Sequence, residues 1–317
     1  MKTLIRSILK EIWERKINRK KNLLKKLARE IKKITLLDIG SAGGISPRWS
    51  PITKNLHYIG IEPDQRSSEK LSEGFDFKDY QIINSVIWSH KKEISFNLCN
   101  KPEVSSVLKP NRQFLNLFPD PKRFEIINRI DSKSTTLDYE LKEVEVDFVK
   151  LDIQGGELDA LLGMEKTLLK CIGLEIEVEF AVVYEGQPLF GDLQKYLQNI
   201  GFEFIDFTSI HRWERKELNN YGQCIFSDGL WMRTPEYIAK NLPQKYLEYI
   251  FICSLYGRYD FVNRMIEIVR PKLSLDFKKC LNKLIRIQRR TRFYHYYLNL
   301  FMKCISGDNE ANMHLIY

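Results

Sequence analysis

Short apolar runs alternate with helix-like segments between residues 34 and 234 of this chain. Strands that alternate with helices favour a parallel sheet covered by helices on both faces. The runs that predict strands are Ile34–Ile39, Tyr58–Ile61, Gln81–Val86, Val146–Ile153 and Gly173–Phe180. Helical patterns follow the last two runs, near residues 156–170 and 192–199. We therefore predict a doubly wound α/β domain over residues 34–234.

Two further apolar runs, Phe202–Phe207 and Cys224–Met232, close this region. No helix-length apolar pattern separates them, so the two strands are predicted to form a hairpin. Such a hairpin places one antiparallel strand in an otherwise parallel sheet.

The N-terminal flank is strongly basic. Residues 1–33 hold 13 Lys and Arg against 3 Asp and Glu, whereas residues 34–234 hold 23 against 31. Apolar residues recur in the flank at helical spacing, namely Leu4, Ile5, Ile8, Leu9, Ile12 and Trp13, and the pattern slips at residues 18–22. This predicts two basic amphipathic helices, or one helix with a break.

Three explanations remain open for this basic extension. Its apolar face can pack on the main domain and leave the charges in water. It can instead lie on an anionic membrane, where each basic residue near the surface adds about 1 kcal/mol of attraction. Nonspecific contact with nucleic acid is the third explanation, although the acidic middle of the chain gives no support to specific nucleic-acid binding.

The C-terminal flank, residues 235–317, holds 14 basic and 7 acidic side chains. Its helix-like segments predict a small helical appendage with breaks at Gly257 and Pro271. The segments are Tyr246–Tyr256, Phe261–Val269, Phe277–Ile287 and Tyr294–Ile305.

The six cysteines are widely spaced and form no CxxC motif, which favours a reducing cytoplasm over a disulfide framework or a zinc site. Lys2, Arg6 and Lys10 interrupt the apolar residues at the N-terminus, so no signal peptide is expected. No run approaches the roughly 20 apolar residues of a spanning helix. We expect a cytoplasmic protein that does not cross a membrane and at most contacts its inner face.

A glycine-rich turn follows the first predicted strand. Asp38 stands at the carboxyl end of that strand, and Gly40, Ser41, Gly43 and Gly44 follow it. Ligands in open α/β sheets bind at this edge, and glycine lets the backbone approach them closely. The spacing is not GxGxxG, which disfavours a dinucleotide. The alternative is a plain strand–turn–helix corner without a ligand.

A second acidic residue ends the second strand. Glu62 lies 22 residues after Gly40 and precedes Pro63. A carboxylate at this place can accept hydrogen bonds from both hydroxyls of a ribose. Asn84 and Ser85, at the end of the third strand, are candidates to face an adenine, or they simply begin a loop.

The fourth strand contains charged residues. Lys150 and Asp152 are two residues apart and therefore point to the same face of the strand. A charged pair in a buried strand is costly unless its members find partners, and this often marks a site, although structural ion pairs also occur. Gly155 and Gly156 then open a helix whose amides can meet an anion or a substrate oxygen.

These motifs resemble the signature stretches of the FkbM family of S-adenosylmethionine-dependent methyltransferases. The similar stretches are Asp38–Gly44, Glu62-Pro63, Val146–Glu157, Leu174–Phe180, Tyr184, Gly186–Phe190 and Gly201-Phe202. The resemblance spans residues 34–234 and implies a seven-stranded, Rossmann-like class I methyltransferase sheet with its last strand antiparallel. It also implies S-adenosylmethionine as cofactor and O-methylation of a sugar, glycan or related hydroxyl. The alternative is a noncatalytic scaffold of the same fold that docks through its helical extensions.

Methyl transfer to a hydroxyl needs an aligned acceptor and a base within hydrogen-bond reach. The candidates are Asp152, Glu177, Glu179 and His211, with Lys150 as the partner of Asp152. Glu179 is the preferred acid because it is nearest the carboxyl end of the fifth strand, and His211 is otherwise a surface histidine. Asp152 and Glu179 could also hold Mg²⁺ through oxygen ligands. The predicted site contains no dedicated metal ligand set.

Overall fold

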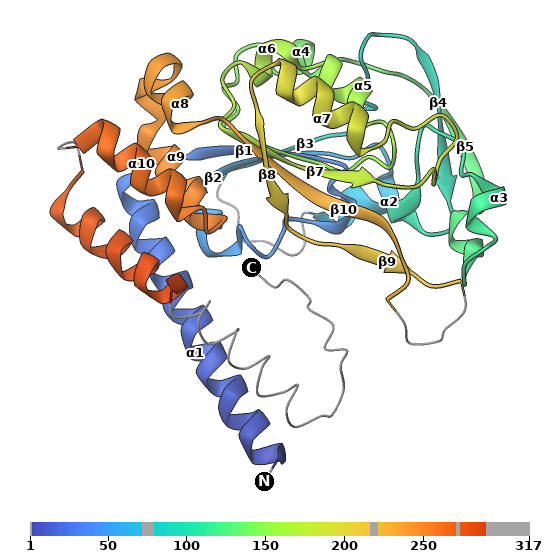
Figure 1. The fold of residues 1–317 in the computed structure, drawn as a ribbon. Helices are drawn as coiled ribbons and strands as arrows, with labels where there is room; N and C mark the ends of the chain where they lie inside the picture. The colour runs from blue at the N-terminus through green and yellow to red at the C-terminus, as the bar shows by residue number, and fades with distance from the viewer. Residues whose placement is uncertain (1, 72–78, 216–220, 271–272, 290–317) are drawn as a thin grey trace.

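The computed structural model describes residues 2–71, 79–215, 221–270 and 273–289, and the side chains of residues 2–10, 12–13 and 69–71 are outside the described part. A central sheet of eight strands organises the molecule (Figure 1). Its strands are β1 (Ile34–Ile39), β2 (Leu56–Ile61), β3 (Tyr80–Ile83), β6 (Phe148–Leu151), β7 (Gly173–Glu179), β8 (Glu203–Phe207), β9 (His211–Trp213) and β10 (Gln223–Met232).

The strand order is β3-β2-β1-β6-β7-β10-β8, with β9 beside β10. Neighbours from β3 to β7 are parallel, and β10 runs antiparallel to β7, β8 and β9. The doubly wound, mostly parallel sheet with an antiparallel hairpin strand is therefore confirmed. The hairpin is not direct, because β9 intervenes. β10 is ten residues long and pairs with β8 only through Gly229–Met232, so its first half is free to pair with β9.

Helices α4–α7 cover one face of the sheet (Figure 1). Leu37, Ile39 and Val149 alternate onto this face and are buried with Leu161 and Leu193. The helices are α4 (Leu137–Glu140), α5 (Glu157–Leu162), α6 (Glu165–Leu168) and α7 (Phe190–Asn199).

One helix was predicted near residues 156–170, but the structure has two, α5 and α6. They are separated at Gly163, where a Cβ would lie 2.3 Å from the carbonyl oxygen of Trp88. The close approach of another chain segment therefore decides where α5 ends.

The N-terminal and C-terminal helices pack on the other face. Leu23, Leu24 and Leu27 of α1 are buried in the same apolar cluster as Leu36 of β1 and Tyr249 of α9. The elements of this layer are α1 (Lys2–Leu27), α8 (Pro235–Asn241), α9 (Tyr246–Leu255), α10 (Tyr259–Val269) and a helix over residues 275–289.

The predicted break at residues 18–22 is wrong, since α1 is continuous there. The segment contains neither Gly nor Pro, and Lys and Arg are good helix formers. The segment Tyr294–Ile305 and the side chains of the face from Leu4 to Trp13 lie outside the described residues. Among the described helices, none combines the length and the apolar character that a membrane span requires.

A separate two-stranded sheet stands at the carboxyl edge of the main sheet. Its strands are β4 (Glu93–Cys99) and β5 (Ile126–Lys133), which pair antiparallel and were not predicted. Short helices complete the chain, namely α2 (Gln65–Leu71), α3 (Arg112–Leu115), and the 3-10 turns η1 (Ala28–Glu30), η2 (Ser41–Gly43), η3 (Ser50–Asn55), η4 (Pro102–Val104), η5 (Pro121–Phe124) and η6 (Pro243–Lys245).

Candidate functional site

The glycine turn joins the carboxyl ends of three neighbouring strands. The amide of Gly40 donates to the carbonyl of Ile61 at 2.9 Å, and the amide of Asp152 donates to the carbonyl of Ile39 at 2.9 Å. Gly40 has φ of +79°, a conformation that side chains disfavour. The ends of β1, β2 and β6 are thereby held together at one point of the sheet edge.

The other residues of the turn, Ser41, Gly43 and Gly44, differ in backbone conformation and in their contacts. Gly44 has φ of +72°, and its amide donates to the carbonyl of Ser41 at 2.8 Å. Ser41 is buried, and its hydroxyl donates to the carbonyl of Ile61 at 3.4 Å. Gly43 needs no special backbone conformation, and a Cβ there would meet no atom within 4 Å. The turn therefore presents an open backbone surface at Gly43.

Asp38 is buried beneath this turn. Its Oδ2 accepts a hydrogen bond from the hydroxyl of Tyr58 at 2.9 Å, and its Oδ1 lies 3.9 Å from the Nζ of Lys150. Among the described residues, no donor makes a hydrogen bond to Oδ1. Burial raises the pKa of Asp38, and the charge of Lys150 opposes that rise. A buried carboxylate oxygen without a donor suits a cationic ligand group.

Glu62 is buried at the end of β2, where its Oε1 accepts from the amide of Asp64 at 2.8 Å. Burial raises the pKa of Glu62 to about 7. Asp64 is fixed in turn by the guanidinium of Arg66 at 2.5 Å. Glu62 stands between two residues that line a pocket, Ile61 and Pro63.

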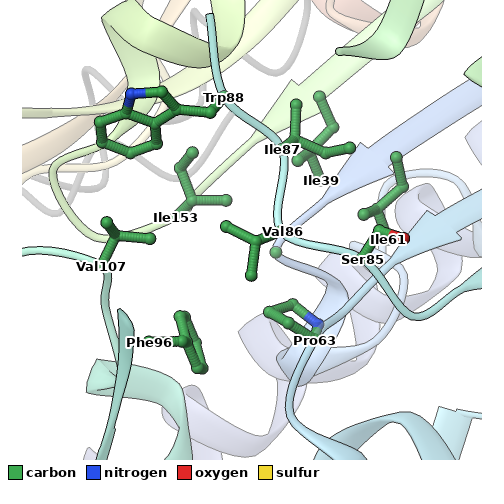
Figure 2. Close-up of a pocket in the computed structure, with 11 residues that line it drawn as sticks. Ile39, Ile61, Pro63, Ser85, Val86, Ile87, Trp88, Phe96, Val107 and Ile153 are labelled. Carbon is green, nitrogen blue, oxygen red and sulfur yellow. The ribbon is translucent and has the colours of Figure 1, made fainter. Parts of the chain in front are cut away.

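That pocket is largely apolar and lies at the carboxyl ends of the strands (Figure 2). It is lined by Ile39, Gly40, Ile61, Pro63, Ser85, Val86, Ile87, Trp88, Phe96, Val107 and Ile153. Of the two residues predicted after the third strand, Ser85 lines the pocket, whereas Asn84 is exposed and does not. Phe96 comes from β4, so the hairpin that the sequence did not reveal supplies one wall.

A polar network lies on the sheet face next to the turn. The Nζ of Lys150 is 3.7 Å from Oδ2 of Asp152, as their spacing predicted. The amide nitrogen of the Gln154 side chain donates to Asp152 at 2.9 Å and to Glu177 at 2.7 Å, and the hydroxyl of Tyr184 donates to Gln154 at 2.8 Å. Gln154 and Tyr184 thus orient two of the candidate acids, although the sequence analysis gave neither of them a role in the site.

The three acids of β7 have different surroundings. Glu175 is buried and accepts hydrogen bonds from Thr208 at 2.6 Å and from Tyr256 at 2.8 Å. Tyr256 follows α9, so a C-terminal helix reaches the middle of the sheet. Glu175 is therefore a structural acid, and Glu177 and Glu179 are the acids nearer the edge.

Burial raises the pKa of Glu177 and of Glu179 well above the ordinary value, and neighbouring carboxylates add to both shifts. Burial also raises the pKa of Asp228, which pairs with Glu177 across the sheet. For Lys150, burial opposes the charge, but the attraction of Asp38, Asp152 and other acids outweighs it and raises the pKa. Lys150 is therefore a permanent cation within an acidic group.

Glu157 is a further buried acid that sequence reasoning missed. It begins α5, and its Oε1 accepts from the amides of Ile153 at 2.9 Å and Gly155 at 3.2 Å. Burial raises the pKa of Glu157 to about 7. An acid directly after Gly155-Gly156 at a helix start was the available signal, because such acids commonly bind free amides. Glu157 fixes the loop that bears Asp152 and Gln154.

His211 lies farther from this network than the sequence suggested. It belongs to β9, is exposed, and stacks on the ring of Phe226 with 4.3 Å between ring centroids. Phe226 in turn pairs with Glu179, so two strand spacings separate His211 from Glu179. In the described part of the chain, no group of three His, Cys, Asp or Glu side chains has an arrangement that could hold a metal ion.

Several solved methyltransferase structures resemble this fold at low identity. An rRNA methylase from Streptococcus thermophilus is 9% identical, with 65% of this chain and 91% of that chain covered and a TM-score of 0.33. A TehB-like SAM-dependent methyltransferase from Corynebacterium glutamicum is 11% identical, with 72% and 97% covered and a TM-score of 0.32. TYW2 of M. jannaschii in complex with AdoMet is 12% identical, with 66% and 74% covered and a TM-score of 0.28.

No curated protein matches the sequence. Residues 49–204 match the family described as the methyltransferase FkbM domain. This range begins after the glycine turn and includes Glu62, Asp152 and the acids of β7, whereas Asp38 precedes it. Residues 49–204 therefore form an FkbM methyltransferase domain, whose cofactor is S-adenosylmethionine.

Proposed function

We propose that this protein transfers the methyl group of S-adenosylmethionine to a hydroxyl group of a sugar, a glycan or a related secondary metabolite. The observation that carries the proposal is the junction of β1 and β6. There the buried Asp38, with one oxygen free of donors, stands beside Lys150 and Asp152 at the edge of the sheet. The residue expected to hold the cofactor and the candidate base thus lie side by side.

The residues present suit the cofactor. Oδ1 of Asp38 would accept from the ammonium group of the methionine part, and the open turn at Gly43 allows close approach. Glu62 would accept hydrogen bonds from the ribose hydroxyls, and the apolar pocket around Pro63 and Phe96 would hold the adenine. When bound, the cofactor supplies a methyl group that is already activated by its sulfonium.

Asp152 is our preferred general base. Lys150 and Gln154 hold its carboxylate, and its side chain is 29% exposed, so an acceptor hydroxyl can reach it. Glu179 was preferred from the sequence, but burial and neighbouring carboxylates raise its pKa and so shift it toward the protonated form. A protonated carboxyl donates a hydrogen bond, so Glu179 is suited to hold an acceptor oxygen rather than to take a proton.

A magnesium-assisted reaction is less well supported by this arrangement. Asp152 already has Lys150 at 3.7 Å, and a metal ion would have to displace that cation. A neutral acceptor with several hydroxyls suits the acids Glu177, Glu179 and Asp228. Carboxyl oxygens accept hydrogen bonds from hydroxyls, and protonated carboxyls donate hydrogen bonds to them.

Calorimetry with S-adenosylmethionine and a methyl-transfer assay test the proposal together. The assay uses S-adenosylmethionine labelled in the methyl group and a glycan extract from cells that produce the protein. We expect saturable binding and label in the glycan fraction that resists mild base, as an ether does and an ester does not. Binding without transfer to any fraction would support a scaffold, and absence of binding would refute the proposed function.

A further inference from the structure

The sheet face that contains the candidate base continues outward across three more strands. Pairing places Glu177 of β7 opposite Asp228 of β10, and Glu179 opposite Phe226. Directly opposed residues of an antiparallel pair point to the same face. The carboxylates next to Asp152 are therefore followed, one strand farther out, by an acid and an aromatic ring.

Aromatic side chains occupy the outer end of this face. The imidazole of His211 lies parallel to the ring of Phe226, with an interplanar angle of 8°. Trp213, two residues along β9, meets the same phenyl ring edge-on at 6.1 Å between centroids. We call His211, Phe226 and Trp213 the aromatic platform. Of its members, His211 is exposed and the other two are partly buried.

Polar groups border the platform on its inner side. Ser209, two residues before His211, donates to Oδ2 of Asp228 at 2.5 Å. Asp228 is followed inward by Glu177, which the side chain of Gln154 connects to Asp152. Hydrogen-bonding side chains therefore stand on this face between β9 and the candidate base, namely Ser209, Asp228, Glu177 and Gln154.

We propose that the aromatic platform is an acceptor subsite that stacks a neutral sugar ring of the glycan, with His211 as a stacking surface rather than a base. This inference rests on the proposed function, because it specifies the class of the acceptor. The stacked sugar would be the neighbour, in the same glycan, of the sugar that is methylated. The exposed imidazole offers a flat face supported from below by Phe226.

The aromatic platform and the polar groups beside it both favour a sugar ring as the ligand. Aromatic faces carry partial negative charge, which attracts the polarised C–H bonds on the flat side of a pyranose ring. Its hydroxyl groups would then point toward Asp228 and Ser209. A nucleic-acid base could also stack on such a surface, and Arg123, which lies 4.8 Å from the centroid of the Trp213 ring, could meet a phosphate, so an oligonucleotide is the competing probe in the test.

Histidine-selective labelling provides a direct test, because the chain has only five histidines. The imidazole signals of the ¹³C-labelled protein would be recorded with S-adenosylhomocysteine present, and the His211 signal identified by its loss in His211→Ala. The probes are methyl glycosides of hexoses, 6-deoxyhexoses and N-acetylhexosamines at millimolar concentrations, and a single-stranded oligouridine. We expect at least one glycoside, but not the oligouridine, to shift the His211 signal.

Two variants separate a stacking surface from a base. His211→Ala should weaken glycoside binding by at least about threefold, whereas His211→Phe should retain it because a flat ring remains. For these variants, binding is followed through the indole signal of Trp213. Methyl transfer by His211→Phe should change only as far as its glycoside binding changes. His90→Ala, which changes another exposed histidine, should alter neither glycoside binding nor methyl transfer.

The inference is overturned if no glycoside shifts the His211 signal, if His211→Ala binds glycosides like the unaltered protein, or if the oligouridine binds instead. Loss of methyl transfer in a His211→Phe variant that still binds glycosides would assign His211 as a base and also overturn it. A failure of the proposed function would give a different result from a failure of this inference. In that case S-adenosylmethionine would not bind in calorimetry, while glycoside shifts at His211 would persist.

Discussion

The carbonyl oxygen of Asp152 lies 1.7 Å from the position that a Cβ on Gly40 would occupy. The turn after β1 and the end of β6 are thus in direct backbone contact, which is what brings the expected cofactor turn to the candidate base. The contact exists only because residue 40 lacks a side chain.

Gly40→Ala should therefore destabilise the protein by about 3 kcal/mol or more, since a clash with backbone adds to the strain of a positive φ. Gly43→Ala is the matched control, because a Cβ there meets no atom within 4 Å. Its free energy of unfolding should stay within about 1 kcal/mol of the unaltered protein. Urea unfolding of both variants checks the contrast, and equal effects would contradict it.

Glu62 should make cofactor binding depend on pH. Its pKa in the free protein is about 7, raised from 4.5 by burial, so it takes up a proton as the pH falls through 7. The protonated carboxyl accepts less well from ribose hydroxyls, and affinity should fall about tenfold between pH 8 and pH 6. Calorimetry at both pH values measures the change.

The control for this prediction is Glu157→Gln, which removes another acid with a pKa of about 7 and should leave the dependence in place. Glu62→Gln should instead weaken binding at pH 8 by about 1–3 kcal/mol and flatten the pH profile. A folded Glu62→Gln protein with unchanged affinity would remove Glu62 from the ribose site.

Asp152→Asn should lower the rate of methyl transfer by about 10²-fold or more and leave the Kd of S-adenosylmethionine nearly unchanged. Asparagine keeps the size and the hydrogen bond from Gln154 but cannot take a proton. Single-turnover rates with the glycan acceptor, together with calorimetry, provide the measurement. A rate near that of the unaltered protein would show that Asp152 serves the ion pair with Lys150 only.

Lys245→Met tests how the C-terminal helices are anchored. The Nζ of the buried Lys245 donates to Asp147 at 2.7 Å and to the carbonyl of Lys170 at 3.0 Å. Removing one member of a buried pair should cost about 3–5 kcal/mol of stability. Lys170→Met, which breaks an exposed pair with Glu145, should cost less than about 1 kcal/mol. Chemical unfolding of both variants would refute this reasoning if the two costs were similar.

Sedimentation with anionic liposomes tests membrane binding by the basic extension, which is one of the three explanations that the sequence leaves open. Because Leu23, Leu24 and Leu27 belong to the core, removing all of residues 1–33 would also disrupt the fold. Deletion of residues 2–14 keeps those three leucines. The full-length protein should bind at low salt and dissociate near physiological salt, where charges are screened over about 8 Å. The shortened protein should stay in solution and still bind S-adenosylmethionine. Equal sedimentation of both proteins would contradict membrane binding by the extension.

The strands of the main sheet were predictable because their signal is local. Ile34–Ile39 is a strand with the predicted bounds, and Tyr58–Ile61 differs from β2 by two residues at its start. Asp38, Glu62 and Asp152 could be placed at strand ends because each directly follows or ends an apolar run. In the β4–β5 pair, β4 has alternating apolar residues, Ile94, Phe96 and Leu98, but β5 gave no comparable signal because most of it is exposed.

Sequence alone therefore determined the alternation of strands and helices, the glycine turn, and the acids at the strand ends, because these depend on neighbouring residues along the chain. Tertiary structure decided which of those acids act together. The contact of Gly40 with Asp152, the capture of Glu175 by Tyr256, and the pairing of β9 with β10 join residues far apart in sequence. Such contacts depend on how buried surfaces fit, and a linear pattern of residue types does not record that fit.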